Sequence, residues 1–353
     1  MCGLFDEPRL YLEWHCMEEL IKLEHGGGGR LMRQLIEEQI VPAYRRTRVE
    51  GGVGLPEMDD GATIPIGGAN IVITTDVHTV KPLFFPGGDI GRLSVCGTVN
   101  DVAVMGAKPL ALTSTLVLEE GLPISTLRRV VGSMASALDE VDLPMIAGDT
   151  KVVERGGTDG LMVSTSGIGL AERVITDSGL RPGNKVIFTG TIGNHQLALL
   201  ATREGLELDA PLESDIAPLW SMIDGAIRVG GVTAMKDPTR GGVSGALNEM
   251  AKKSGVEIDL QEEEIPIRGV VRSASELLGL DPLELANEGI AVMGVEGDMA
   301  EEVLKATMRD RYGRDAAIVG EVREGRGRVV LETFVGGRRI VREPLGSPMP
   351  RIC

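Results

Sequence analysis

Short β-rich segments alternate with helical patterns along the second half of the chain, and this alternation constrains the fold more than any other feature. Such a sequence buries its apolar surface by packing helices in layers on a sheet. It therefore predicts an α/β fold for this half. The predicted strands are residues 186–188, 256–260, 290–295 and 317–322, and the predicted helices are residues 195–204, 243–254 and 299–312.

The first half carries the same two kinds of pattern. Leu31, Leu35, Ile36 and Ile40 recur at helical spacing within residues 29–46. Further helices are predicted at 90–105 and 125–140, and strands at 71–75, 110–118, 145–147 and 161–170. A turn at residues 180–184 opens a new α/β unit. We therefore predict an extension (1–24), an N-terminal domain (25–179), a C-terminal α/β domain (180–342) and a flexible tail (343–353).

Charge and cysteine usage narrow the class of protein. A net charge of −16 disfavours nucleic acid and anionic membrane surfaces as partners. No apolar run is long enough to cross a bilayer, and residues 1–7 lack the basic and apolar regions of a signal peptide. The four cysteines show neither disulfide nor zinc spacing. We expect a cytoplasmic protein.

The last residue of the sequence is a cysteine, Cys353, and prolines at 344, 348 and 350 precede it. Proline prevents this stretch from forming a helix, and its ten residues reach roughly 30 Å when extended. A thiol on such an arm is well placed to carry a chemical group between sites. On position alone, a frayed end that happens to finish in cysteine is the better explanation.

Several aspartates lie at predicted strand ends and glycine-flanked turns, a setting that suits Mg²⁺ bound by carboxylates and phosphate oxygens. Any single aspartate there is just as readily a turn former or a helix cap. Their number in glycine-rich surroundings favours a metal site. The candidate metal ligands are Asp60, Asp76, Asp101, Asp149 and Asp237.

Other polar groups suit phosphate and amide chemistry. The glycine run 26–29 precedes a predicted helix, where backbone amides favour an anion, although such a run is also typical of a linker. Arg240 suits a phosphate clamp or a surface ion pair. Lys151 suits a transferring phosphoryl group or a solvated strand end, and Glu288 suits a base or a turn carboxylate.

Taken together, eight strings resemble the HypE family of hydrogenase maturation factors, the carbamoyl dehydratases of the superfamily of aminoimidazole ribonucleotide synthetase and selenophosphate synthetase. The resemblance spans about residue 22 to Cys353. Within it, Val77-His78 and Lys236 depart from the usual pattern. The strings are HGGGG (25–29), TTDVHTVKPLFFPGGDIG (74–91), CGTVNDVAVMGAKP (96–109), GDTKVV (148–153), SDIAPL (214–219), DPTRGGV (237–243), ANEG (286–289) and PRIC (350–353).

The resemblance implies two α/β domains, with the N-terminal one completing a β-barrel in a homodimer. It also implies a reaction. A carbamoyltransferase, HypF, loads the Cys353 thiol. ATP and Mg²⁺ then drive dehydration of the carbamoyl group to a thiocyanate, and the cyano group passes to iron on a HypC–HypD scaffold. Lys151 and Glu288 are assigned to the carbamoyl end, and the aspartates to Mg–ATP. The implied nucleotide-binding residues are His25, Gly26, Gly28, Gly29, Asn100, Gly148, Thr150 and Arg240.

Two other interpretations remain. The first is another enzyme of this superfamily, such as selenophosphate synthetase or thiamine-phosphate kinase, neither of which needs a terminal cysteine. The second is a scaffold protein whose terminal thiolate binds iron or forms a mixed disulfide, although one thiolate alone is a poor metal site. A scaffold does not hydrolyse ATP, and this separates it from the dehydratase.

Overall fold

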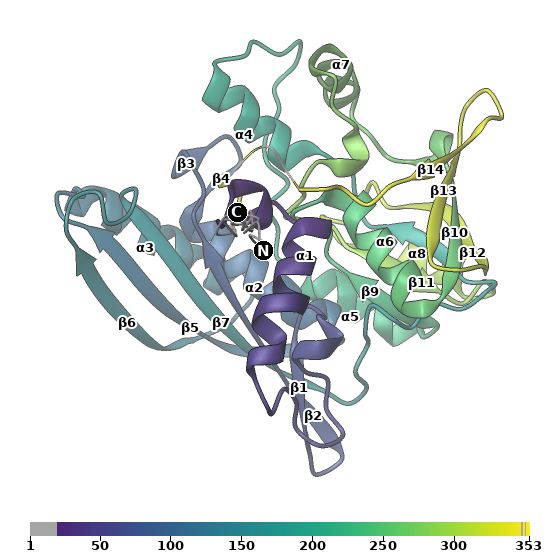
Figure 1. Cartoon of the computed structure of the whole chain (residues 1–353), viewed down its shortest axis with the longest axis horizontal. Coiled ribbons are helices and arrows are strands. Elements are labelled where there is room, and N and C mark those ends of the chain that lie inside the picture. The colour runs from purple at the N-terminus through teal and green to yellow at the C-terminus, as the bar shows by residue number, and fades with distance from the viewer. Residues whose placement is uncertain (1–19, 347–348, 350) are drawn as a thin grey trace, which may run out of the picture.

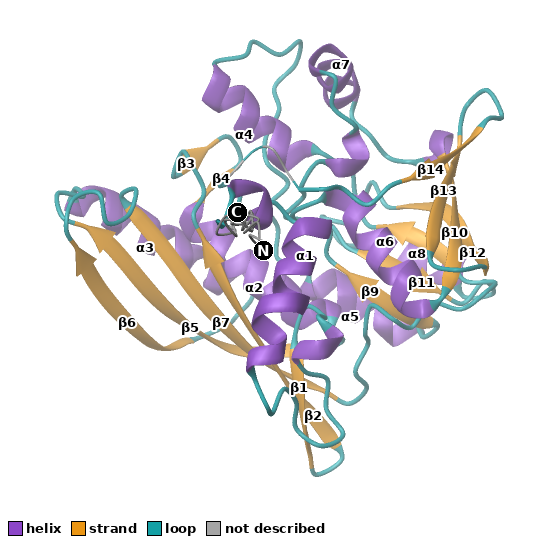
Figure 2. Ribbon diagram, viewed as in Figure 1, coloured by secondary structure: helices purple, strands orange, loops and turns teal. Residues whose placement is uncertain are grey.

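Two β-sheets organise the computed structural model, which describes residues 20–346, 349 and 351–353. One sheet has five strands in the order β1-β2-β7-β5-β6, and the other has seven in the order β14-β13-β10-β12-β8-β11-β9. Figures 1 and 2 show the five-stranded sheet on the left of the view and the seven-stranded sheet on the right. The first 19 residues, including Cys2 and Cys16, lie outside the described part.

The five-stranded sheet is mostly antiparallel, but β5 and β6 run parallel and are joined by helix α3. Helix α2 packs on β2 and β7 and against α3. It begins after Asp89, whose carboxylate accepts hydrogen bonds from the amides of Gly91 and Arg92. The elements are β1 (Ala62–Ile66), β2 (Ala69–His78), β5 (Lys108–Glu119), β6 (Met145–Val153), β7 (Leu161–Ala171), α2 (Ile90–Val104) and α3 (Ile124–Glu140).

The seven-stranded sheet lies between helices. An apolar cluster joins one face to α6, and a second cluster joins the other face to α5 and α8. The strands are β8 (Lys185–Phe188), β9 (Val232–Lys236), β10 (Val256–Gln261), β11 (Val292–Val295), β12 (Ala317–Glu324), β13 (Arg328–Glu332) and β14 (Arg338–Val341). The helices are α4 (Asn194–Glu204), α5 (Trp220–Val229), α6 (Gly242–Ser254), α7 (Gly269–Leu278) and α8 (Ala300–Thr307).

Shorter elements lie outside the two large sheets. Helix α1 (Arg30–Leu35) continues into a π-helical turn at Ile36–Ile40, so the predicted helix within 29–46 is present but irregular. A two-stranded hairpin, β3 (Phe84–Phe85) with β4 (Gly88–Asp89), precedes α2. Within the described residues, no helix combines the length and the apolar character needed to cross a membrane.

Two predicted strand ends are wrong. Asp76 does not end its strand, because β2 continues to His78 and Asp76 pairs with Thr165 of β7. Asp149 lies in the middle of β6, opposite Thr115 of β5. In both cases the apolar pattern stops before the backbone pairing does. The predicted helix at 299–312 is also shorter, ending at Thr307.

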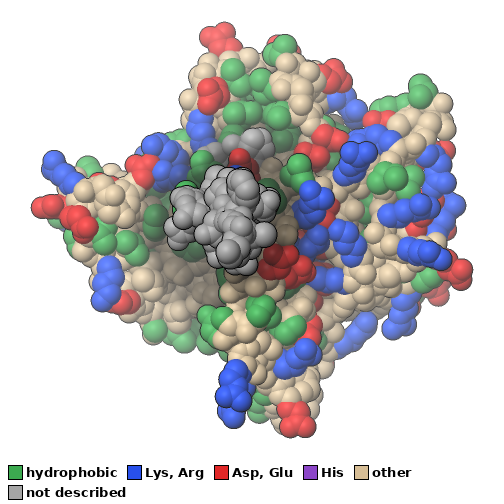
Figure 3. Space-filling model, in the orientation of Figure 1, with side chains coloured by type: hydrophobic (Ala, Val, Ile, Leu, Met, Phe, Trp, Pro, Cys, Tyr) green, Lys and Arg blue, Asp and Glu red, His purple; other side chains and the backbone are tan. Residues whose placement is uncertain are grey.

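Basic side chains gather over β13 and β14 on the right of Figure 3. Two of them pair with carboxylates of β10: Arg338 contacts Asp259 at 2.7 Å, and Arg328 contacts Glu257. Arg339 pairs instead with Asp281 outside the sheet at 2.9 Å. Part of the patch is therefore neutralised by nearby carboxylates.

Candidate active site

The end of the chain is folded back onto the protein. The amide of Thr79 donates to the carbonyl of Cys353 at 3.1 Å, and the amide of Lys81 donates to the carbonyl of Arg351 at 3.2 Å. The Arg351 Nε donates back to the carbonyl of Thr79 at 2.9 Å. The two backbone bonds run in the antiparallel sense, so the tail lies alongside residues 79–81, just beyond the end of β2.

Side chains of the tail add to this docking. Ile352 is only 2% exposed and packs in the apolar cluster that contains Phe85 and Leu199. Arg351 forms an ion pair with Asp159, which also binds Lys81 at 2.7 Å. Cys353 is thereby held in one place rather than carried on a free arm.

The docked thiol lies among charged groups. Burial raises the pKa of Cys353 to about 12, the positive charge of Arg240 opposes this shift, and the negative charges of Glu288 and Asp76 add to it. In turn the thiolate charge and Glu288 raise the pKa of Arg240. Cys353, Arg240 and Glu288 therefore belong to one site, in which the resting sulfur is a protonated thiol.

Glu288 sits in the loop Asn287–Gly289 before β11 and is almost fully buried. Burial and the charges of Asp237 and Asp215 raise the pKa of Glu288 well above its ordinary value. Its Oε1 is buried and has no hydrogen-bond partner among the described residues. A buried carboxyl oxygen without a partner is costly, so this atom is suited to receive a substrate N–H.

The loop holding Glu288 is fixed by its neighbours. A Cβ on Gly289 would stand 1.7 Å from the carbonyl oxygen of Asp215, so only glycine fits there. Asn100 donates through Nδ2 to the carbonyl of Glu288 at 3.3 Å and to that of Ala217 at 3.0 Å. It also accepts from the amide of Leu219 at 2.9 Å. These bonds account for Asn100 as a brace between α2 and the Glu288 loop.

Four of the predicted metal carboxylates lie close to one another. Burial raises the pKa of Asp101 well above its ordinary value, and the charges of Asp76 and Asp237 raise it further. The pKa of Asp237 rises for the same reason, with Asp60 as the main neighbouring charge. Thr74 donates to Asp101 at 2.7 Å. Mutual repulsion of this kind is relieved by a cation.

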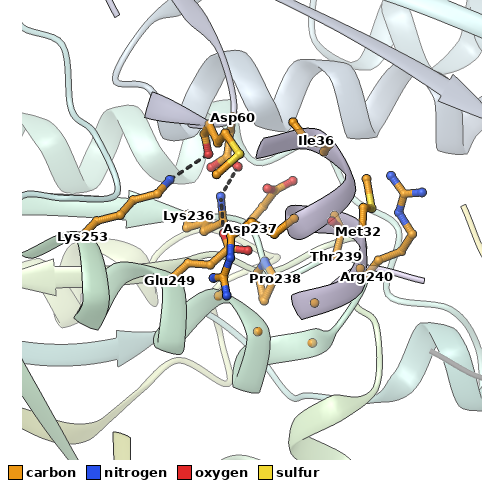
Figure 4. A pocket seen from close by; sticks show the side chains of 17 residues that line it. Met32, Ile36, Asp60, Lys236, Asp237, Pro238, Thr239, Arg240, Glu249 and Lys253 are labelled. Atoms are coloured by element: carbon orange, nitrogen blue, oxygen red, sulfur yellow. Dashed lines mark hydrogen bonds and ion pairs between the residues drawn. The ribbon is translucent and has the colours of Figure 1, made fainter. Parts of the chain in front are cut away.

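Mg²⁺ fits this donor set. Lys236 binds Asp60 Oδ1 at 2.5 Å (Figure 4), and Asp60 Oδ2 is buried with no partner in the described part of the chain. Among the described residues, no three His, Cys, Asp or Glu side chains form a ready-made metal site. Mg²⁺ commonly takes only one or two carboxylates and completes its shell with water and phosphate oxygens. Asp76, Asp101 and Asp237 would hold it in that manner.

The glycine segment borders the same site. Gly28 and Gly29 line a cavity of about 190 Å³ together with Asp60, Asp237 and Arg240. Gly28 packs on the Arg240 carbonyl, and Gly29 packs on the Pro344 carbonyl. The first amides of α1 are already in use, because those of Arg30 and Leu31 donate to the carbonyls of Pro344 and Leu345. His25 and Gly26 lie at the outer end of the segment, where His25 Nδ1 accepts from the Lys22 amide.

The remaining predicted residues lie apart from this site within one chain. Gly148, Asp149, Thr150 and Lys151 are exposed on β6, the edge strand of the five-stranded sheet. The side chains of Asp149 and Lys151 are 62% and 69% exposed and pair with each other at 3.7 Å. Figure 1 places β6 at the far left and the C-terminus near the middle of the molecule.

Sequence reasoning missed two groups of this site. From the sequence, Lys236 stood out only as a departure from the family pattern. In the structure it forms buried ion pairs with Asp60 and with Asp177, the latter at 3.5 Å. Asp215 is half-buried, and desolvation raises its pKa to about 7. The position of Asp215 inside the SDIAPL string was the only available signal.

Comparison with known proteins places this geometry in a family. The N-terminal domain model of AIR synthase related proteins matches residues 58–171, and the C-terminal domain model matches residues 181–332. The carbamoyl dehydratase HypE of Cupriavidus necator is 45% identical over 337 residues, which cover 94% of this chain and 95% of that protein. The chain belongs to the HypE family of carbamoyl dehydratases.

Solved structures of HypE proteins agree. A HypE in a HypE–HypF complex matches with a TM-score of 0.82 and 44% identity, over 88% of this chain and 99% of that one. A HypE in complex with ATP matches with a TM-score of 0.79 and 37% identity, over 94% of this chain and 99% of that one. The predicted two-domain fold of this superfamily is confirmed.

Proposed function

We propose that this enzyme dehydrates an S-carbamoyl group carried on Cys353 to a thiocyanate at the expense of ATP, and so supplies the cyanide ligands of the [NiFe] hydrogenase iron. The observation that carries the proposal is the docked tail, which brings the terminal thiol into one site with Glu288 and Arg240. ATP binding is supported by the HypE relative solved with ATP.

The reaction removes the elements of water in two steps. The carbamoyl oxygen attacks the γ-phosphorus of ATP, one N–H proton is lost, and S–C(OPO₃)=NH and ADP form. The second nitrogen proton is then removed, the C–O bond breaks, and phosphate leaves as the C≡N bond forms. Phosphorylation is needed because oxide is a poor leaving group and phosphate is a good one. The scheme requires a base near nitrogen and positive charge near phosphate.

The residues of the site fit these tasks. Glu288 Oε1 has no partner and accepts a proton from the carbamoyl nitrogen. A carboxylate whose pKa is raised is a stronger base than an ordinary one, so burial of Glu288 assists proton removal. Arg240 stabilises negative charge on the oxygen side. Mg²⁺, held by Asp76, Asp101 and Asp237, supplies charge neutralisation for the triphosphate.

Loading and unloading require the tail to leave its docked position. The nucleophile and leaving group in thiol chemistry is the thiolate, and docking disfavours it by raising the pKa of Cys353 to about 12. We therefore expect carbamoylation by HypF, the partner present in one related structure, to act on the undocked tail. Delivery of the cyano group to a HypC–HypD iron scaffold follows the same logic.

A second copy of the chain would complete the site. Within residues 20–346, no strand pairs with the outer edge of β6, and apolar side chains such as Val77 and Val152 stand exposed on this sheet. Exposed apolar edge strands are covered in native proteins. Pairing of two such sheets would make a barrel in a homodimer and carry Asp149 and Lys151 away from solvent. We propose that Lys151 then serves the phosphoryl group of the partner's site.

Intact-mass spectrometry tests the function. After loading by the carbamoyltransferase, addition of ATP and Mg²⁺ should remove the mass of one water from the adduct. Removal of Cys353 should abolish both the adduct and the loss while leaving ATP binding intact, because no described nucleotide contact depends on the thiol. Replacement of Cys2 and Cys16 by serine is the matched control and should change nothing. Loss of water without Cys353 would show that the carrier is misassigned.

A further inference from the structure

A fully buried histidine binds the main chain of the tail. The Nε2 of His195, at the start of α4, lies 2.7 Å from the carbonyl oxygen of Ile352. Its Nδ1 lies 2.7 Å from the hydroxyl of Ser214, and its ring meets the ring of Phe85 edge-on at 5.8 Å. The ring is thus held on three sides before any substrate is present.

The partners define the tautomer of this histidine. A carbonyl oxygen only accepts, so Nε2 of His195 carries the hydrogen and Nδ1 is free to accept. The Ser214 hydroxyl therefore donates to Nδ1, and its oxygen accepts from the amide of Ile216 at 3.3 Å. Burial lowers the pKa of His195 to about 4, so the ring is neutral. Each nitrogen and oxygen in the Ile352–His195–Ser214 hydrogen bonds can therefore be assigned as a donor or an acceptor without conflict.

The same turn also touches the loop of the base. Asp215 follows Ser214, and its Oδ1 accepts from the amide of Glu288 at 3.1 Å. The amide of Ala217 donates to the carbonyl of Glu288 at 3.4 Å. A short chain of contacts therefore runs from the tail through His195 and Ser214 to the backbone of Glu288.

We propose that His195 is a positioning residue for the carrier tail: its hydrogen bond to Ile352 holds Cys353 beside Glu288, and the Ser214–Asp215 turn ties the tail site to the base. The role of this contact in catalysis rests on the proposed function, whereas the hydrogen bond between His195 and Ile352 does not depend on it. His195 does not touch the reacting atoms, so its effect is on the docked population and not on the chemistry of the docked state.

The test measures docking and catalysis separately, in a Cys2→Ser/Cys16→Ser background in which Cys96 is fully buried. The first measurement is alkylation of Cys353 by iodoacetamide without ATP or partner. His195→Leu should raise this rate roughly tenfold, because it removes the donor and leaves a buried carbonyl without a partner. His195→Gln should restore the slow rate, since its amide N–H replaces the imidazole N–H. Thr202→Ala, a change on the same helix away from the tail, should match the parent.

The second measurement is single-turnover dehydration of protein that has been carbamoylated beforehand. Because the docked state stays favoured after a tenfold shift, His195→Leu should slow it by less than twofold, while carbamoylation by the partner enzyme, which acts on the undocked tail, should rise with the undocked population. An alkylation rate for His195→Leu within twofold of the parent overturns the proposal. So does a Gln variant that behaves like Leu, because ring packing rather than the hydrogen bond would then matter.

If His195→Leu does not fold, Ser214→Ala serves instead. This change removes the hydroxyl that donates to His195 Nδ1, so the Nε2–H tautomer is no longer favoured. The alkylation rate of Cys353 should rise about two- to threefold, and an unchanged rate overturns the proposal. Alkylation of Cys353 needs neither ATP nor a carbamoyl donor, so it tests docking independently of the reaction. If the parent protein docks its tail but its carbamoyl adduct never loses water, the proposed function is contradicted and the docking role of His195 is not.

Discussion

Replacement of Ile352 by alanine offers a quantitative test of tail docking. The Ile352 side chain is 2% exposed and lies in the cluster with Phe85 and Leu199. The change removes three buried carbon groups, worth about 2.4 kcal/mol at roughly 0.8 kcal/mol per group. The cavity left by the missing side chain adds little to this cost, because the short tail can undock rather than keep an empty space in the docked state. The docking equilibrium should therefore shift by about 50-fold.

Thiol reactivity reports this shift directly. With Cys2 and Cys16 replaced by serine and Cys96 fully buried, a disulfide reagent such as DTNB reacts with Cys353. If the docked thiol is shielded and protonated, the reaction goes through the undocked state and its rate scales with the undocked population. Ile352→Ala should react about 50-fold faster than the parent, up to the rate of the denatured protein.

The matched control lies in the same tail. Leu345 is 58% exposed, so Leu345→Ala loses little buried surface and should change the rate less than about threefold. Two results would refute the reasoning. One is a rate for Ile352→Ala within threefold of the parent. The other is a parent protein whose Cys353 already reacts as fast as it does in denaturant.

Three further changes test other parts of the structure. Lys236→Ala leaves buried carboxylates unpaired and should cost about 3–5 kcal/mol of unfolding free energy, against about 1 kcal/mol or less for the more exposed Lys185→Ala, both measured by chemical denaturation. Val152→Asp on β6 should convert a dimer to a monomer in light scattering, whereas Val335→Asp in the β13–β14 turn should not; an unchanged mass for the first rules out the β6 interface. Asp76→Asn should weaken Mg²⁺-dependent ATP binding by calorimetry, and unchanged affinity removes it from the metal site.

The sequence predicted helices and strands well where burial of one face spaces the apolar residues at a regular period. The helices at 90–105 and 125–140 were placed within one residue at each end, because one is mostly apolar and buried on nearly every side and the other has a single apolar stripe. The ends of β2 and β6 were not, because Asp76 and Asp149 interrupt the apolar pattern without interrupting the backbone ladder. Hydrogen bonding between strands is set by the partner strand, and no local pattern reports it.

The site shows a similar division. Single residues such as Glu288 and Asp237 were found because they lie in distinctive strings. Their relations were not found, since Asp60 and Lys236 are 176 residues apart and meet only when the two sheets pack. The docking of Cys353 was beyond local reasoning for the same reason: its partners near Thr79 and at His195 come from separate elements.

The contacts of the tail bear on the proposed carrier role. It is held by backbone hydrogen bonds, by side-chain bonds from His195, Arg203 and Arg351, by one buried isoleucine and by an exposed ion pair between Arg351 and Asp159. Exposed ion pairs contribute little, and each hydrogen bond only about 1 kcal/mol, so the docked state is favoured by a few kcal/mol. In the proposed mechanism, a docking free energy of this size keeps the carbamoyl group beside Glu288 during the reaction and still lets the tail open, as a carrier loaded elsewhere requires.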